Sequence, residues 1–264
     1  MRRTVKTLGS LLLFVLLFVV AQAGVSLAVG VFGFGLLDEN GITDFGFMAI
    51  YLMSMMLVYV LVSLAERVVF GGLRPTMHGR RGFDPIGLLL GVVIVLSLSV
   101  VLSPLGELMP ADQRSFPEGG WTLFSVIVLA PVFEELIFRA RLYNILSRSA
   151  SPIAAASLSA LMFGAVHLEP IVVIEGFVVG IVLSYFYLQK RSIVAPILLH
   201  ACNNAIAYAL HFVTYRGESL LDLLGDSVPF YVVYALSVVV MPGAAVVVLR
   251  RFARERYAGA ELQE

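Results

Sequence analysis

The sequence predicts an all-α membrane protein, and three observations carry that prediction. Hydrophobic residues make up 59% of the 264 positions, and the mean hydropathy is +0.94. Charged residues make up only 14%, against roughly 25% in an ordinary soluble domain. Eighteen acidic and eighteen basic side chains cannot cover the surface of a soluble protein of this size. The composition therefore excludes soluble globular, disordered and collagen-like classes.

The apolar residues fall into about eight stretches, and a helix needs roughly 20 such residues to cross a bilayer. Backbone groups in lipid must be satisfied within the segment, and the stretches lack the alternation of barrel strands, so each is predicted to be a helix. The expected spans are residues 8–37, 45–64, 86–108, 121–146, 152–168, 170–189, 193–213 and 228–249. No soluble stretch is long enough for a second domain, so residues 1–264 are expected to form a single transmembrane domain.

The first span has a second interpretation. Its basic start, the apolar run Leu11 to Val20 and the sequence Ala21-Gln22-Ala23 resemble a secretory signal with its cleavage site. The apolar stretch continues to Leu37, well beyond the hydrophobic region of a signal, and this favours a retained helix. Cleavage would leave seven spans.

The positions of lysine and arginine predict the orientation of the bundle, because positive flanks are retained in the cytoplasm. Sixteen of the eighteen precede the first span, lie at the end of the fourth, or follow the second, sixth or eighth, whereas the opposite breaks hold only Arg114 and Arg216. We therefore expect both termini in the cytoplasm. His78 lies in a basic loop beside Arg80 and Arg81, and arginines also cluster after the last span. Anionic lipid headgroups are the expected partner of both regions.

The fourth span carries two adjacent glutamates, Glu134 and Glu135, followed by Arg139. Ionisable groups cost roughly 3 kcal/mol each at the bilayer centre, so they normally face a partner or a polar cavity. Glu135 and Arg139 are four residues apart on one helix face, which predicts an ion pair. Glu134 projects about 100° away and lacks that partner. Such a desolvated carboxylate suits the role of a general base.

Two later spans carry the remaining polar groups that we assign to the site. Phe163 and His167 lie one turn apart in the fifth, and His200 and Asn204 lie one turn apart in the seventh. An unpaired glutamate and a histidine can deprotonate a water, and a second histidine with an amide can stabilise an oxyanion. These are the parts of a hydrolytic site, and we expect Glu134, His167 and His200 around one water-accessible cavity. His211, near the outer end of the seventh span, is expected to be interfacial.

Other interpretations remain open at this point. Each residue taken singly is more often a helix-to-helix contact than a catalyst. Carboxylates and histidines in spans also mark proton-coupled carriers, and Glu175 in the sixth span adds to that alternative. Inverted repeats or interrupted helices would indicate such a carrier, and neither is visible in the sequence. A scaffold or bacteriocin-immunity protein that works by binding is the third alternative.

The three motifs together resemble the CPBP family of intramembrane proteases, also called the Abi or CAAX-protease family. They are Glu134-Glu135-x-x-x-Arg139, Phe163-x-x-x-His167 and His200-x-x-x-Asn204, in this order on successive spans. The resemblance covers about residues 85–215, which we expect to be the protease core. Members of the family cleave prenylated CAAX proteins, process peptides or protect against bacteriocins.

The resemblance implies a role for each motif residue. Glu134 would be the general base acting with His167 on water, His200 and Asn204 would stabilise the oxyanion, and Glu135 with Arg139 would orient the site. Two features depart from or complicate the family pattern: Ala140 stands where glycine is frequent, and Asn203 offers a rival amide.

A metal is the other open point. Two imidazoles and a carboxylate also suit an open zinc site, and the family is described both as metalloprotease and as glutamate-dependent protease. The His-Glu-x-x-His helix signature of zinc proteases is absent, which favours the metal-free mechanism.

The sequence thus predicts an intramembrane endopeptidase that hydrolyses a membrane-associated or hydrophobic peptide. A net charge of zero gives no reason to expect nucleic acid. The short chain favours a bacterial plasma membrane.

Overall fold

A computed structural model describes residues 2–33, 35–39, 41–76, 84–109, 117–213 and 228–261. His78 and the side chain of His211 lie outside this described part. The same holds for four arginines used in predicting the orientation: Arg80, Arg81, Arg114 and Arg216.

The described chain is almost entirely helical, which confirms the all-α part of the prediction. Its helices are α1 (Arg2–Phe32), α2 (Asp44–Val68), α3 (Pro85–Leu108), a composite helix (Gly120–Leu146), α7 (Pro152–Ala165), α8 (Pro170–Lys190), α9 (Val194–Val213) and α11 (Val228–Glu261). Six are long and apolar enough to cross a membrane, whereas α7 and the apolar part of α9 are shorter. A hairpin of two-residue strands, β1 (Leu37–Asp38) and β2 (Gly41–Ile42), is the exception among the described residues.

Two of the predicted spans extend beyond the C-terminal ends of their helices, for the same backbone reason. The first helix stops at Phe32 rather than at Leu37, because Gly33 and Gly35 adopt left-handed conformations with φ of 67° and 65°. The fifth stops at Ala165 rather than at residue 168, and Leu168 has a φ of 66°. His167 therefore lies in the turn between α7 and α8, not within a helix.

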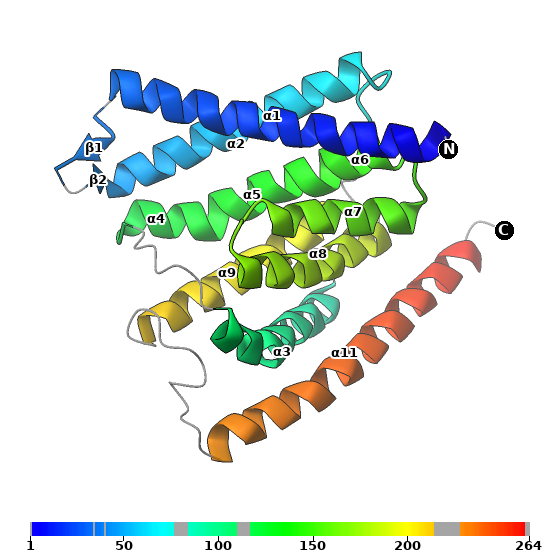
Figure 1. The fold of residues 1–264 in the computed structure, drawn as a ribbon. Coiled ribbons are helices and arrows are strands. Elements are labelled where there is room, and N and C mark those ends of the chain that lie inside the picture. The colour runs from blue at the N-terminus through cyan, green and yellow to red at the C-terminus, as the bar shows by residue number, and fades with distance from the viewer. Residues whose placement is uncertain are drawn as a thin grey trace.

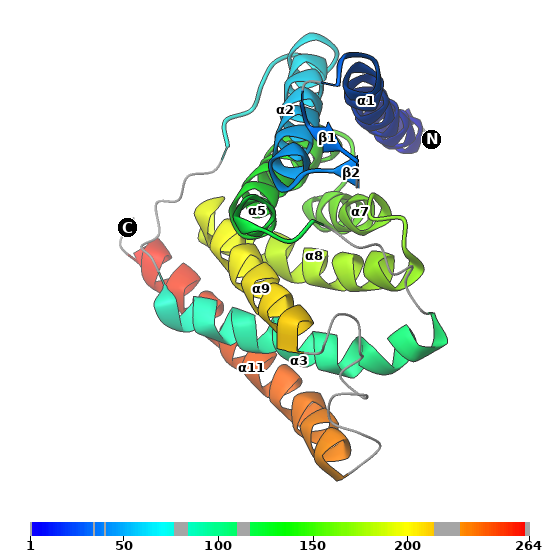
Figure 2. The ribbon, with the colours of Figure 1, turned by 90° about the vertical axis from the view of Figure 1, so that its left-hand side faces the viewer.

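The helices are arranged with α1 and α2 along one edge and α3 and α11 along the opposite edge (Figures 1 and 2). The composite helix, α7, α8 and α9 lie between them. One apolar core joins α1, α2, the composite helix, α7 and α8. A second core joins α3, α8, α9 and α11. Helix α8 contributes to both.

The composite helix contains two π-helical segments. Its parts are α4 (Gly120–Phe124), η1 (Ser125–Leu129), α5 (Ala130–Glu135), η2 (Leu136–Leu142) and α6 (Tyr143–Leu146). At the end of η1 the Ala130 N–H donates to the Ser125 carbonyl, five residues back. Pro131 follows and has no N–H, so the Val126 carbonyl lacks the donor that would continue this pattern.

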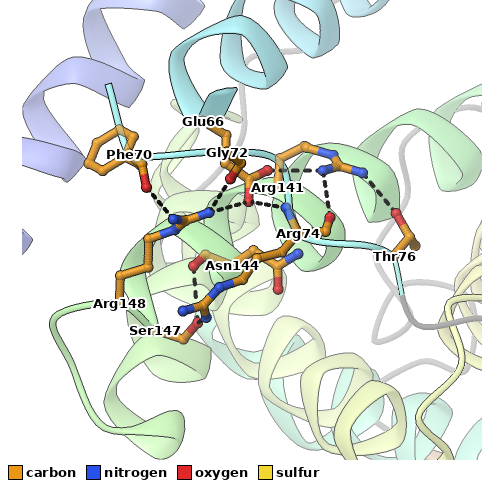
Figure 3. Close-up of polar contacts among 9 residues, drawn as sticks. All are labelled: Glu66, Phe70, Gly72, Arg74, Thr76, Arg141, Asn144, Ser147 and Arg148. Atoms are coloured by element: carbon orange, nitrogen blue, oxygen red, sulfur yellow. Dashed lines mark hydrogen bonds and ion pairs between the residues drawn. The ribbon is translucent and has the colours of Figure 1, made fainter. Parts of the chain in front are cut away.

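Helix α2 runs parallel to the composite helix and is tied to it near both ends. Near its start, the Asp44 carboxylate accepts hydrogen bonds from the backbone N–H groups of Trp121 and Thr122, at 3.1 and 2.7 Å. Near its end, the fully buried Glu66 carboxylate accepts hydrogen bonds from Arg141 and Arg148, at 2.9 and 3.1 Å (Figure 3). These contacts fix the register of the two helices.

The buried Glu66 also organises the segment after α2. Its carboxylate accepts a hydrogen bond from the Arg74 backbone N–H at 3.0 Å. The two arginines that bind Glu66 reach the same segment: Arg141 donates to Thr76, and Arg148 donates to the Gly72 carbonyl (Figure 3). With these several donors, the hydrogen-bonding capacity of the buried Glu66 carboxylate is satisfied.

Candidate active site

The two adjacent glutamates of the composite helix have different surroundings. Glu135 is fully buried, whereas the side chain of Glu134 is 12% exposed. Glu135 faces Arg139 and α9, and Glu134 faces α2 and α9. The difference in direction follows from their adjacency on one helix.

Glu135 forms the ion pair that the spacing of four residues predicts. Arg139 Nη1 donates to Glu135 Oε1 at 2.9 Å, and Arg139 Nη2 donates to the Gly180 carbonyl of α8 at 3.2 Å. Both side chains are buried. Since Arg139 fills the space between two helices, the pair ties the composite helix to α8.

His200 lies between the two carboxylates. Its Nδ1 is 3.0 Å from Glu135 Oε1, which is hydrogen-bonding distance, and its Nε2 is 3.7 Å from Glu134 Oε2. An ionised carboxylate can only accept, so Nδ1 carries the hydrogen of the first contact. The second distance is too long for a direct hydrogen bond and suits a bridging water. Residues 65 positions apart thus meet in one buried cluster.

Glu134 has a further partner that the sequence analysis missed. The Tyr51 hydroxyl of α2 donates to Glu134 Oε1 at 2.8 Å. The motifs lie within residues 85–215, and Tyr51 precedes that range. A tyrosine in an apolar span is too common to single out, so the signal was weak.

His167 is exposed in the turn after α7. Its Nδ1 lies 2.9 Å from the Phe163 carbonyl oxygen. Because a carbonyl only accepts, Nδ1 carries the hydrogen, and in the neutral ring Nε2 is left with a lone pair. This tautomer can accept a hydrogen bond from water.

The Phe163 ring links the two histidines. Its centroid is 5.4 Å from those of both imidazoles, so His167 and His200 lie within twice that distance of each other. The Arg139 guanidinium lies over the same ring, 4.4 Å from its centroid. Phe163 is buried. The ring therefore packs against three of the predicted site residues.

Helices α7 and α8 approach each other closely behind this ring. A Cβ added at Gly164 would lie 2.4 Å from the Val173 carbonyl oxygen, and one at Gly180 would lie 3.2 Å from the Phe163 ring. Only glycine fits at the first position. This close approach brings the Gly180 carbonyl within reach of Arg139.

Asn204 is held by the composite helix. Its Nδ2 donates to the Val126 carbonyl at 2.9 Å, which is the carbonyl left without a helical donor by Pro131. Its Oδ1 accepts a hydrogen bond from Asn203 Nδ2 at 3.4 Å. The second N–H of the Asn204 amide remains for another acceptor. The sequence analysis missed this contact, because the link between Pro131 and the Val126 carbonyl depends on the π-helical hydrogen bonding of η1.

The described residues do not fit a zinc site. Among them, no three His, Cys, Asp or Glu side chains converge closely enough to hold a metal ion. Glu175, which the sequence offers for a carrier, makes no hydrogen bond or ion pair within the described chain.

The water-accessible cavity expected around Glu134, His167 and His200 stays a prediction. A cleft of about 420 Å³ lies between α3 and α11, and no predicted site residue lines it. Its lining residues are Ile86, Val247, Arg250, Arg251 and Arg254.

Comparison with known protein families identifies the segment that contains these residues. Residues 117–206 match the family described as type II CAAX prenyl endopeptidase Rce1-like. The matched segment includes all seven residues singled out from the three motifs. No curated protein and no solved structure matches the chain. Residues 117–206 are thus an Rce1-like CAAX prenyl endopeptidase domain of the CPBP family, which is a family of peptidases.

Proposed function

We propose that the protein is an intramembrane endopeptidase that hydrolyses a peptide bond of a membrane-associated or hydrophobic peptide. The observation that carries the proposal is the position of His200 between Glu134 and Glu135. A structural ion pair would need only one carboxylate and Arg139. The second carboxylate, less buried and 3.7 Å from an imidazole nitrogen, has the arrangement of a general base beside a hydrogen-bond donor.

In the proposed reaction, a water between Glu134 Oε2 and His200 Nε2 attacks the scissile carbonyl carbon. Glu134 accepts the proton of this water, and His167 Nε2 accepts a second hydrogen bond that orients it. The bond to the leaving nitrogen then breaks, and Glu134 returns the proton to that nitrogen. Water is consumed and two peptides are released.

His200 and Asn204 stabilise the negative charge on the attacked oxygen in this proposal. For His200 to donate to that oxygen, Nε2 must carry a hydrogen while Nδ1 donates to Glu135. The donating form is therefore the imidazolium. Glu134 and Glu135 then face two cations, His200 and Arg139, which balances the charge of the buried cluster.

We further propose that the whole chain is one transmembrane domain with its protease core at residues 85–215, in a bacterial plasma membrane. The distribution of lysine and arginine supports a cytoplasmic location for both termini. Its partners are membrane lipid and the peptide substrate. Terminal tags that are digested by added protease in inside-out vesicles and protected in right-side-out vesicles would support this orientation; the reverse pattern would contradict it.

The test of activity is peptide cleavage by purified protein in detergent, on a panel of fluorogenic hydrophobic and prenylated peptides. Glu134→Gln and His167→Ala are expected to lower kcat by at least about 100-fold. Glu175→Gln, which removes another glutamate from a span, is the matched control and should keep wild-type activity. A chelator arm separates metal-dependent from metal-free hydrolysis.

Each outcome separates the candidate functions. Cleavage lost in Glu134→Gln and kept in Glu175→Gln supports the protease. A folded wild-type protein that cleaves no peptide of the panel contradicts it and favours the carrier or the binding scaffold. Loss of activity on chelation would contradict the metal-free mechanism.

A further inference from the structure

The segment before the family domain places one polar side chain against the proposed general base. The Tyr51 hydroxyl of α2 donates to Glu134 Oε1 at 2.8 Å, across 83 positions of sequence. The aromatic ring of Tyr51 packs against the larger apolar core. The ring of Tyr51 thus makes apolar contacts, and its hydroxyl makes the polar contact with Glu134.

The position of Tyr51 is fixed by the ties between α2 and the composite helix. Asp44 holds the backbone of Trp121 and Thr122 on one side of it, and Glu66 holds Arg141 and Arg148 on the other (Figure 3). Tyr51 lies between Asp44 and Glu66 in the sequence of α2. Sliding or rotation of α2 would break these contacts, so the hydroxyl is held at Glu134.

We propose that Tyr51 is a positioning residue that selects which oxygen of Glu134 accepts the proton of the attacking water. This inference rests on the proposed function. The phenol occupies Oε1, and Oε2 is the oxygen that faces His200 Nε2 at 3.7 Å. With one oxygen held, the carboxylate cannot turn, and the basic oxygen stays beside the imidazole.

The proposal extends the active site beyond the family domain. Tyr51 lies outside residues 117–206, which contain Glu134, His200 and Asn204. Substrate contacts are not required for this role, since Tyr51 acts through the carboxylate. A loss of the hydroxyl should therefore affect turnover and leave substrate binding unchanged.

The first test replaces the hydroxyl alone. Tyr51→Phe keeps the ring in the core and is expected to lower kcat about 10- to 100-fold, the range for losing a hydrogen bond to a charged group. KM is expected to change less than about twofold, since ground-state binding is untouched. Tyr59→Phe, on the same helix with its ring 5.7 Å from the Arg141 guanidinium, is the matched control and keeps wild-type kcat.

The second test asks whether Tyr51 acts through Glu134. Glu134→Asp retains a carboxylate but withdraws it by one methylene from the phenol. In that background Tyr51→Phe should lower kcat by less than about twofold, because the contact is already lost. An equal loss in both backgrounds, or a Tyr51→Phe kcat equal to that of wild type, would overturn the proposal. The unfolding temperature of each variant excludes misfolding as the cause.

The two proposals fail in different ways. If Glu134→Gln is inactive while Tyr51→Phe and wild type cleave equally, the role of Tyr51 alone is wrong. If Glu134→Gln cleaves as well as wild type, the proposed mechanism is wrong and the role of Tyr51 fails with it.

Discussion

Arg139 makes three contacts in the site, and only its ion pair with Glu135 depends on charge alone. Its two terminal nitrogens reach different helices, one to Glu135 and the other to the Gly180 carbonyl, while its plane lies over Phe163. A planar group with several donors in a fixed fork can do this, and an ammonium cannot. The identity of the cation therefore matters as much as its charge.

Arg139→Lys is accordingly expected to impair the protein although it keeps the charge. Lysine can pair with Glu135 but cannot also donate to Gly180 and stack on Phe163, so we expect about 1–3 kcal/mol of lost stability. Arg139→Met leaves Glu135 buried without its main partner and is expected to lose about 3–5 kcal/mol. Thermal unfolding in detergent measures both. Arg250→Lys, at an exposed position, is the control; equal unfolding temperatures for Arg139→Lys and wild type would contradict the argument.

At the scale of elements, the contact of α9 with the composite helix through Asn204 can be tested separately for its effects on stability and on activity. Asn204 supplies the donor that Pro131 cannot, and the proposed mechanism also gives Asn204 a place at the oxyanion. In the proposed mechanism, one amide group therefore has both a structural and a catalytic role.

Asn204→Leu should lower both stability and activity, because the partly buried Val126 carbonyl loses its donor, at up to about 1–3 kcal/mol. Adding Pro131→Ala restores an N–H that can donate to this carbonyl. The double variant should recover part of the unfolding temperature but none of the cleavage rate. A double variant that is no more stable than Asn204→Leu would show that Pro131 is not the reason for the contact.

The close approach of α7 and α8 gives another prediction at this scale. Gly164→Ala places a Cβ against backbone atoms of α8 and forces the helices apart, which is expected to lower stability by about 1–3 kcal/mol. Gly24→Ala, in α1 with nothing within 4 Å of the added Cβ, should be neutral or stabilising. Thermal unfolding of the two variants distinguishes a packing effect from helix propensity; equal shifts would contradict it.

At the scale of the whole molecule, one acidic residue joins three helices. Asp84, just before α3, accepts hydrogen bonds from Lys190 at the end of α8, at 2.8 Å, and from Arg251 Nε of α11, at 2.9 Å. Burial by itself would raise the pKa of Asp84, but the hydrogen bonds from Arg251 and Lys190 lower it well below its ordinary value.

This depressed pKa makes part of the stability pH-dependent. A carboxyl that is more acidic in the folded state stabilises the fold above its unfolded pKa of about 3.9, and the contribution is lost as pH falls through the folded value. Asp84→Asn should therefore unfold at a lower temperature than wild type at neutral pH, and the gap should narrow below about pH 4. A gap that is constant with pH would contradict this.

The sequence was sufficient to predict the helices and the side-chain contacts within a single helix. The spacing of Glu135 and Arg139 predicted their ion pair, and the eight apolar stretches correspond to eight helices in the described part of the chain, six of which are long and apolar enough to cross a membrane. The helix ends at Phe32 and Ala165 were missed, because backbone turns at Gly33 and Leu168 override an apolar sequence that continues beyond them.

Contacts between distant helices were beyond what spacing could predict. That His200 would use one nitrogen for each glutamate, or that Tyr51 would reach Glu134, depends on how α9 and α2 pack against the composite helix. Periodicity determines which face of a helix is polar, and it does not determine which partner that face meets.

The presence of α8 in both apolar cores has a consequence for how the molecule loses its structure. Because α8 packs in both apolar cores, loss of one core removes contacts that hold α8 in the other. The two cores should therefore unfold cooperatively. The fluorescence of Trp121, the only tryptophan, reports on the half near α2, and labelling of Cys202, the only cysteine, reports on α9. Coincident denaturation curves from the two probes are the expected signature, and a chain whose halves behaved as separate units would give two midpoints.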